Sequence, residues 1–246
     1  MIRYEVEGGH LPVLICYPEA GQTLCTESGA MSWMSSNMKM DTNTGGGMKK
    51  VLGRMFTGES LFMNEYTAEK TSGMIAFASR FPGSIIPYQV TAGNSIIVQK
   101  NGFLAMEKGL DLSIYFQKKL GKGFFGGEGF ILQKLQGNGL AFVHGGGTIV
   151  RRTLMPGQIL KIDTGCLVAM TKNVIYDIQF VGGLKNTVFG GEGLFFATLT
   201  GPGDVWIQSL PFSKLADRII SAAPQLGNRS KDEGSILGGI SNLFEN

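Results

Sequence analysis

Recurring glycine landmarks constrain the fold of this 246-residue chain more than any other feature of its sequence. One landmark is a Gly-Glu pair before a small and an apolar residue, and the other is a Gly-Gln or Gly-Asn pair before an apolar run. The first begins at Gly58, Gly127 and Gly191 and the second at Gly21, Gly93 and Gly157, at intervals of 64 to 72 residues. Because two independent landmarks share one period, the sequence predicts a module that is built three times.

The runs on either side of four glycine-containing motifs have the composition of β-strands. Runs rich in apolar residues lie at 130–136 and 140–144 around one motif, and at 194–200 and 205–209 around another. Asn-Gly and similar pairs supply the positive φ angles of tight hairpin turns, so each motif predicts a hairpin. The motifs are Gly8-Gly9, Ser72-Gly73, Gly137-Asn138-Gly139 and Gly201-Pro202-Gly203.

The other half of each module is predicted to hold strands with one buried face. The alternating apolar positions are Leu112, Ile114 and Phe116 in one copy and Tyr176, Ile178 and Phe180 in another. A period of two places one face on a core and the other in solvent. The hairpin halves number four and the other halves three. We therefore expect the last hairpin to pack beside the first module and close the arrangement within one chain.

The predicted fold class is all-β, with three tandem repeats of a short module and a short C-terminal helix. Ser213 fits the N-cap of a helix over 214–220 that ends before Pro224. Apolar residues at helical spacing in 234–246 are typical of an amphipathic helix that packs on the protein, on a partner subunit or on a membrane surface. The predicted divisions are repeat 1 (1–57), repeat 2 (58–126), repeat 3 (127–190), a closing hairpin (191–212), and the C-terminal helix and tail (213–246).

Composition and charge argue against several classes of protein. With 43% apolar residues the chain buries a core, and its net charge of +3 is too small for an electrostatic nucleic-acid footprint. No apolar run is long enough to cross a bilayer, and the amino terminus has no export or transit pattern. Three cysteines without a C-x-x-C pair predict free thiols in a reducing cytosol. The expected compartment is therefore cytoplasmic.

The sequence predicts no catalytic, metal or cofactor site. Its two histidines, His10 and His144, adjoin glycine turns rather than a nucleophile motif. The run 121–126 matches G-x-G-x-x-G, but a strand pattern follows it, so no helix N-terminus is available for a pyrophosphate. No spacing of His, Cys, Asp or Glu fits a metal. The triple glycines at 45–47 and 145–147 leave open an anion cradled by backbone amides.

Three glutamates recur at the Gly-Glu landmark and are the candidate repeat-turn residues: Glu59, Glu128 and Glu192. A carboxylate after glycine can accept backbone N–H bonds and fix a turn, which is the interpretation that we favour. The alternative is an acidic ring or cap that the modules share.

Several motifs resemble the altered-inheritance-of-mitochondria family, a group of largely uncharacterised mitochondrial-biogenesis proteins. They are the segments 127–131 and 191–195, the run Val-Trp-Ile-Gln-Ser-Leu-Pro-Phe at 205–212 and Leu-Ala-Asp-Arg at 215–218. The resemblance covers about residues 1–220 and brings no established catalytic residues. It implies a fold like that of the tryptophan-RNA-binding attenuation protein, a short double-stranded β-helix or β-sandwich module, here triplicated.

We expect the chain to be a non-enzymatic structural, scaffold or binding protein that self-assembles through its β modules. The attenuation protein forms a ring of one-module subunits, so the resemblance implies a smaller ring, such as a homotrimer that covers its edge strands. The other expected partner is a protein, a lipid or a small ligand of unknown identity. The alternative is an RNA-binding or small-ligand-binding regulator, which rests on fold analogy alone.

Overall fold

The computed structural model describes residues 1–43, 63–79, 81–118, 130–180 and 195–222. The chain divides into two compact units, Met1–Ser213 and Lys214–Asn246. The first unit is built of antiparallel β-strands, and the α-helix of the described residues is α3 (Phe212–Ala222). These elements confirm the predicted all-β class with a short C-terminal helix. The helix begins one residue before Ser213, the expected N-cap.

Among the described residues, two 3-10 turns interrupt the succession of strands. In chain order the elements are β1 (Arg3–Glu7), β2 (Val13–Tyr17), β3 (Thr23–Glu27), β4 (Met31–Met34), β5 (Met38–Asn43), β6 (Met63–Ala68), β7 (Ile75–Ala78), β8 (Gly83–Val90), β9 (Ile96–Gln99), η1 (Lys100–Gly102), β10 (Phe103–Glu107), β11 (Leu110–Lys118), β12 (Phe130–Gly137), β13 (Gly139–Gly146), β14 (Ile149–Leu154), β15 (Ile159–Asp163), η3 (Thr164–Cys166), β16 (Leu167–Thr171), β17 (Ile175–Phe180), β18 (Phe195–Thr200) and β19 (Gly203–Gln208).

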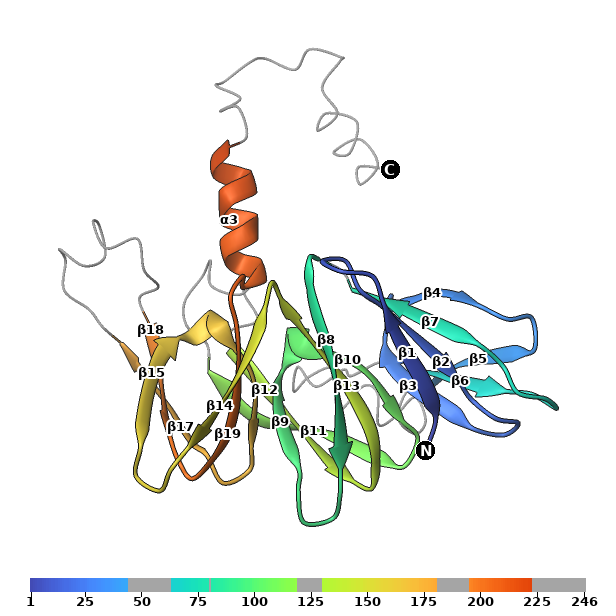
Figure 1. Cartoon of the computed structure of the whole chain (residues 1–246), viewed down its shortest axis with the longest axis horizontal. Coiled ribbons are helices and arrows are strands. Elements are labelled where there is room, and N and C mark those ends of the chain that lie inside the picture. The colour runs from blue at the N-terminus through green and yellow to red at the C-terminus, as the bar shows by residue number, and fades with distance from the viewer. Residues whose placement is uncertain (44–62, 80, 119–129, 181–194, 223–246) are drawn as a thin grey trace, which may run out of the picture. The chain divides into compact units, whose positions relative to one another are not determined.

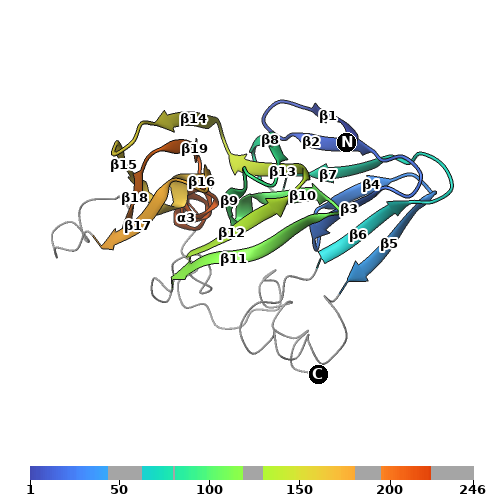
Figure 2. The same ribbon diagram turned by 90° about the horizontal axis from the view of Figure 1, so that it is seen from below.

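The strands of the described residues form four antiparallel sheets that follow one another along the first unit (Figures 1 and 2). Their orders are β1-β2-β7-β4, β5-β6-β3-β10-β13-β8, β11-β12-β9-β16-β19-β14 and β15-β18-β17. The triplet β2-β7-β4 has the same order of pairing as β8-β13-β10 and β14-β19-β16, and β3-β6-β5 has the same order as β9-β12-β11 and β15-β18-β17. The pairs β3–β10 and β9–β16 join triplets of the two kinds into six-stranded sheets.

A β-bulge lies at the same place in three of these strand pairs. The register shifts fall between Met31 and Trp33 in β4, Phe103 and Ala105 in β10, and Leu167 and Ala169 in β16. An extra residue at a bulge bends the strand and increases its twist. The strand pairing therefore defines corresponding positions along the chain. The predicted division into tandem repeats and the double-stranded β-helix description stay predictions.

Three of the four predicted hairpins are wrong. Strands β12 and β13 flank Asn138 but lie in different sheets, and so do β18 and β19 on either side of Pro202. A two-residue type I′ turn needs positive φ at both central residues, whereas only Gly137 of its motif has it, at +123°. The motif is thus a corner where the chain passes from one sheet to another. The strands on either side of Ser72-Gly73, β6 and β7, are also in different sheets.

The first predicted hairpin is confirmed, and the expected closure of the chain is not seen in the strand pairing. β1 and β2 pair over five residues around Gly8-Gly9, and β2 continues to β7. β18 pairs with β15 and β17, and β19 with β14 and β16. The sheets of β2 and β18 lie at opposite ends of the row in both views (Figures 1 and 2). The strands within 195–208 complete the last sheets instead of returning to residues 1–20.

The predicted alternation of buried and exposed positions is confirmed in β11 and β17. Leu112 and Phe116 are half-buried beside exposed Asp111 and Tyr115. In β17, buried Ile178 has exposed neighbours on both sides. Strand β13, which lies between β10 and β8, is in contrast buried at every residue. It therefore has a continuous apolar run in place of an alternating pattern.

In the described part of the first unit, three clusters of buried side chains form the core. Tyr66, Phe77 and Phe142 belong to one cluster, Trp206 to the second and Phe130 to the third. The rings of Tyr66 and Phe77 meet edge to face with centroids 5.9 Å apart, a favoured geometry for aromatic pairs. The clusters draw on strands from different sheets, so the sheets share their core.

Candidate functional site

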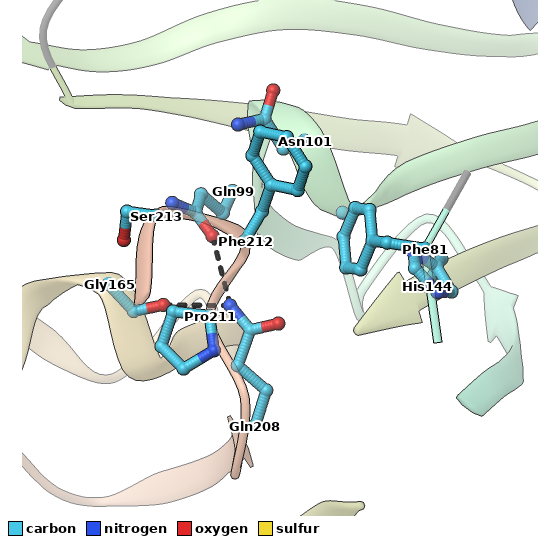
Figure 3. Close-up of a pocket in the computed structure, with 10 residues that line it drawn as sticks. Phe81, Gln99, Asn101, His144, Gly165, Gln208, Pro211, Phe212 and Ser213 are labelled. Atoms are coloured by element: carbon cyan, nitrogen blue, oxygen red, sulfur yellow. Dashed lines mark hydrogen bonds between the residues drawn. The ribbon is translucent and has the colours of Figure 1, made fainter. Parts of the chain in front are cut away.

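A cavity of about 210 Å³ lies where β3 ends, β10 begins and β13 approaches its last residue. We call it the aromatic cavity. Its lining residues are Glu27, Ala30, Phe81, Asn101, Phe103, Leu104, His144 and Phe212. A smaller hollow shares four of these residues and extends to Gln99, Gly165 and Gln208 (Figure 3). The polar atoms of the aromatic cavity come from one carboxylate, one amide and one imidazole.

Aromatic rings form one side of the aromatic cavity. The Phe81 and Phe212 centroids are 5.3 Å apart with a tilt of 40°. Phe81 also meets the imidazole of His144, with centroids 4.5 Å apart and ring planes at 66°. Phe212 is 51% exposed although it lines the cavity. Its ring therefore lies between the cavity and solvent.

His144 is buried, and one nitrogen of its ring contacts a neighbouring serine. Its side chain is on β13, 4% exposed, and its Nε2 lies 2.5 Å from Ser79 Oγ. Burial lowers the pKa of His144 from 6.5 to about 4, and a hydrogen bond to the Phe81 carbonyl opposes this shift. The imidazole is consequently neutral at neutral pH.

The hydrogen bonds of Ser79 do not match those of an activated nucleophile. The Ser79 hydroxyl donates to the backbone carbonyl of Phe81. Because a hydroxyl has one proton, the short contact with His144 is made by the imidazole N–H donating to Ser79 Oγ. A general base would instead accept the proton of the serine. This arrangement holds Ser79 and Phe81 against the end of β13.

Gln208 at the end of β19 ties three segments together. Its Oε1 accepts from the Gly146 N–H at 2.7 Å, and its Nε2 donates to the Gly165 carbonyl at 2.7 Å. The same Nε2 lies 3.5 Å from Gln99 Oε1, as the dashed lines of Figure 3 indicate. Gln208 is 6% exposed. One buried side chain thus satisfies backbone groups of β13 and η3.

The glycines near His144 allow backbones to approach closely. A Cβ at Gly146 would lie 1.9 Å from the Leu210 carbonyl oxygen, and one at Gly83 would lie 2.0 Å from the Gly145 oxygen. The Gly146 and Gly147 N–H groups donate to Gln208 and to the Pro82 carbonyl. At least two of the amides at 145–147 therefore already have acceptors within the protein, which argues against the anion cradle that the sequence left open there.

The free thiols are confirmed for the two cysteines buried in strands. Cys16 and Cys25 form no disulfide. Burial is the main cause that raises the pKa of Cys16 to about 12 and that of Cys25 to about 11. Both remain protonated at neutral pH and pack as small apolar side chains.

Most of the sites expected from sequence lie outside the described residues. This holds for the candidate repeat-turn residues Glu59, Glu128 and Glu192, for the glycines at 45–47, and for the G-x-G-x-x-G run at 121–126. It also holds for the tail at 234–246. Their expected roles stay predictions.

The described residues contain no group of three or more metal-ligating side chains. Within the same ranges, no helix has both the length and the apolar character to span a bilayer. Of the residues that line the aromatic cavity, the sequence marks His144 as a turn neighbour and Phe212 as the last residue of the run at 205–212. The others come from segments far apart in sequence, and no local motif marks them.

In the part of the chain that the structure describes, two strands lie at the ends of their sheets. The strands that correspond to them in the other sheets have a neighbouring strand on both sides. β4 lies at the end of the first sheet and β15 at the end of the last. Trp33 on β4 is 46% exposed and Ile159 on β15 is 60% exposed. Both edges thus combine a terminal position in a sheet with exposed apolar side chains.

Comparison with known proteins identifies a family and finds similar proteins in Streptococcus pyogenes. Residues 4–210 match the family model described as mitochondrial biogenesis AIM24. An uncharacterized protein of Streptococcus pyogenes serotype M6 is 27% identical over 218 residues, which cover 85% of this chain and 86% of that protein. A crystal structure of a Streptococcus pyogenes protein matches with a TM-score of 0.75 and 24% identity over 91% of this chain and 100% of that chain, a likeness that shows the fold.

These matches leave the likeness to the attenuation protein as a prediction, and they confirm the family resemblance. The match extends from β1 to the segment after β19, which includes the cavity residues from Glu27 to His144. The chain belongs to the mitochondrial biogenesis AIM24 family.

Proposed function

We propose that this chain is a non-enzymatic scaffold or binding protein that self-assembles by pairing β15 of one copy with β4 of another. The observation that carries the proposal is a pairing that occurs twice inside the chain, β3 with β10 and β9 with β16. β15 occupies the place of β3 and β9 in its triplet, and β4 occupies the place of β10 and β16. The two terminal edges are therefore complementary.

Exposed side chains at both edges support this pairing. A strand at the end of a sheet presents backbone N–H and C=O groups that a strand of another chain can pair with. Trp33 and Ile159 are large apolar residues that such a pairing would bring toward a neighbouring copy. Removing apolar surface from water stabilises association by roughly 25 cal/mol per Å².

The two internal pairs also give the expected register. Met106 of β10 lies opposite Cys25 of β3, and Met170 of β16 lies opposite Ile97 of β9. The corresponding residue of β4 is Met34, because Met34, Met106 and Met170 hold the same position opposite β7, β13 and β19.

On β15 the corresponding residue is Lys161. It faces Thr198 of β18, as Cys25 faces Glu65 of β6 and Ile97 faces Lys134 of β12. The assembly therefore places Lys161 of one copy opposite Met34 of the next. Each copy offers one edge of each kind, so association is head to tail and yields a ring if the rotation closes.

Sedimentation velocity of the purified full chain tests the assembly. We expect an oligomer for the native sequence and monomers for Ile159→Lys and Trp33→Lys, because a charge on an edge strand opposes pairing. Ile175→Lys is the matched control, since Ile175 is 66% exposed on β17, at the opposite edge of the sheet that contains β15. A native chain that sediments as a monomer at high concentration would overturn the proposal.

Cross-linking tests the register. One preparation carries Met34→Cys and the other Lys161→Cys, and the mixture is oxidised. We expect a disulfide-linked heterodimer in high yield, because directly opposed residues of an antiparallel pair bring their Cβ atoms within disulfide range. Lys39→Cys, on a strand in another sheet, replaces Met34→Cys in the control mixture. Equal yields from the two mixtures would contradict the proposed register.

A further inference from the structure

We propose that the aromatic cavity is a binding site for a small, uncharged aromatic molecule that carries a hydrogen-bonding substituent, such as a phenol. This goes beyond self-assembly, because the cavity is formed within one copy by residues distinct from the two edges. Its walls come from the turn after β3, η1 with the start of β10, the end of β13, and the residues that precede β8 and begin α3.

The volume fits a single ring. The cavity measures about 210 Å³, and a cavity of roughly 150 Å³ lined by apolar side chains is large enough to hold benzene. The additional space corresponds to a short substituent. A fused system with several rings exceeds it, as does a lipid chain at full length.

The apolar part of the wall suits an aromatic ring. Phe81 and Phe212 lie tilted toward each other with centroids 5.3 Å apart, and Phe103 and Leu104 also line the cavity. Both Phe103 and Leu104 are nearly fully buried, so this wall is packed in place by the core. Rings favour edge-to-face and offset contacts with other rings at these separations.

The polar part of the wall suits an uncharged ligand with a donor or acceptor. Asn101, which is exposed, offers an amide with both functions. Glu27 adds a carboxylate that already accepts from Gln133 Nε2 at 3.4 Å, and this negative charge disfavours an anionic ligand. Burial keeps His144 neutral, with its pKa lowered to about 4. An environment that costs the imidazole its charge also penalises a ligand cation.

Calorimetric titration with four probes of similar size tests the proposal: phenol, benzyl alcohol, benzylamine and benzoate. We expect saturable binding of the two alcohols, with the largest amide chemical-shift changes at residues 101–104 and 144. Tighter binding of benzylamine or of benzoate than of the alcohols would overturn the uncharged class. Absence of saturable binding for all four would overturn the site.

Two variants locate the binding. Ala30→Leu adds volume at a 5% exposed residue of the cavity lining, so we expect it to abolish phenol binding. Phe212→Ala removes an exposed ring from the cavity mouth, and we expect phenol affinity to fall about tenfold, as for the loss of one aromatic contact. Because Phe212 is 51% exposed, this variant still tests the site if Ala30→Leu does not fold.

Tyr115→Ala is the matched control, since it removes a 46% exposed ring on β11 that does not line the cavity. We expect native phenol affinity for it. Equal loss of affinity in Tyr115→Ala and Phe212→Ala would contradict the location. The monomeric Ile159→Lys chain serves as a second control, because a failure of assembly that leaves phenol binding intact separates this inference from the proposed function.

Discussion

His144 near the end of β13 and Gln208 at the end of β19 occupy corresponding positions in the strand pairing. Their buried polar groups are nevertheless satisfied in different ways. His144 lies opposite Ile85 of β8, and Gln208 lies opposite Ile149 of β14. Both are buried, at 4% and 6% exposed. The amide of Gln208 bonds Gly146 and Gly165 with good geometry. The imidazole of His144 is held from one side, and the aromatic cavity lies beside it.

This difference shows that strand pairing determines where the ends of β13 and β19 lie. The side chain at that position determines which contacts hold the neighbouring segments together. A buried amide that satisfies two backbone groups locks neighbouring segments, and removing it leaves both groups without partners. A buried imidazole fills space and stays neutral, so its effect on the free energy of unfolding depends on pH. The third corresponding position is Ala78, which needs no polar partner at all.

Removing the amide of Gln208 at the end of β19 should have the largest effect on stability. Gln208→Leu keeps the approximate volume but leaves the Gly146 N–H and the Gly165 carbonyl buried without their partner. At about 1–3 kcal/mol for each such group, we expect a loss of about 4 kcal/mol in the free energy of unfolding. Urea denaturation at neutral pH measures it.

Gln99→Leu is the control for that variant. Gln99 is 7% exposed, and its contact with Gln208 is long, at 3.5 Å. We expect it to cost about 1 kcal/mol or less. Comparable losses in Gln99→Leu and Gln208→Leu would show that the amide of Gln208 does not lock the corner.

The stability that His144 contributes near the end of β13 should instead decrease in acid. The folded-state pKa of His144 is depressed to about 4 from 6.5, so the unfolded chain binds the proton more readily. Stability from the neutral imidazole is complete above the unfolded pKa and is lost as the pH falls toward the folded pKa. The shift corresponds to about 3 kcal/mol in full, and to about 2 kcal/mol between roughly pH 7 and pH 4.5.

The variant His144→Gln isolates this contribution, because it places at β13 the residue that β19 carries at the corresponding position. Carboxylates that titrate in the same range affect both chains equally. We expect the free energy of unfolding of the native chain to fall by about 2 kcal/mol more than that of His144→Gln over this range. Parallel pH profiles for the two proteins would show that His144 does not supply the acid sensitivity.

Local chemistry allowed strand and helix positions to be predicted, but it could not identify which strands pair. The alternation in β11 and the helix after Pro211 follow from periodicity and capping, which act within a few residues. The motif at Gly137-Asn138-Gly139 has the composition of a hairpin turn. Its flanking strands nevertheless join different sheets, because their partners β9 and β10 are distant in sequence.

The candidate site was largely invisible in the sequence for a related reason. His144 stood out because histidines are scarce, and the run that contains Gln208 stood out through its family resemblance. Phe212 ends that run without a predicted role, and Phe81 and Phe103 are ordinary aromatic residues far from it along the chain. The fold brings these residues from distant segments to one cavity. No sequence period or spacing predicts that they lie together.

The smallest expected effect concerns the hydroxyl that holds the imidazole. Ser79→Ala removes the acceptor of the His144 N–H, while the Phe81 carbonyl remains as an acceptor. One hydrogen bond is therefore exchanged rather than a group orphaned, and we expect a loss of about 1 kcal/mol at neutral pH. The control is Ser113→Ala on β11, which should be near neutral. A loss as large as that of Gln208→Leu would mean that both corners are locked by hydrogen bonds, and the contrast between them would then rest on charge alone.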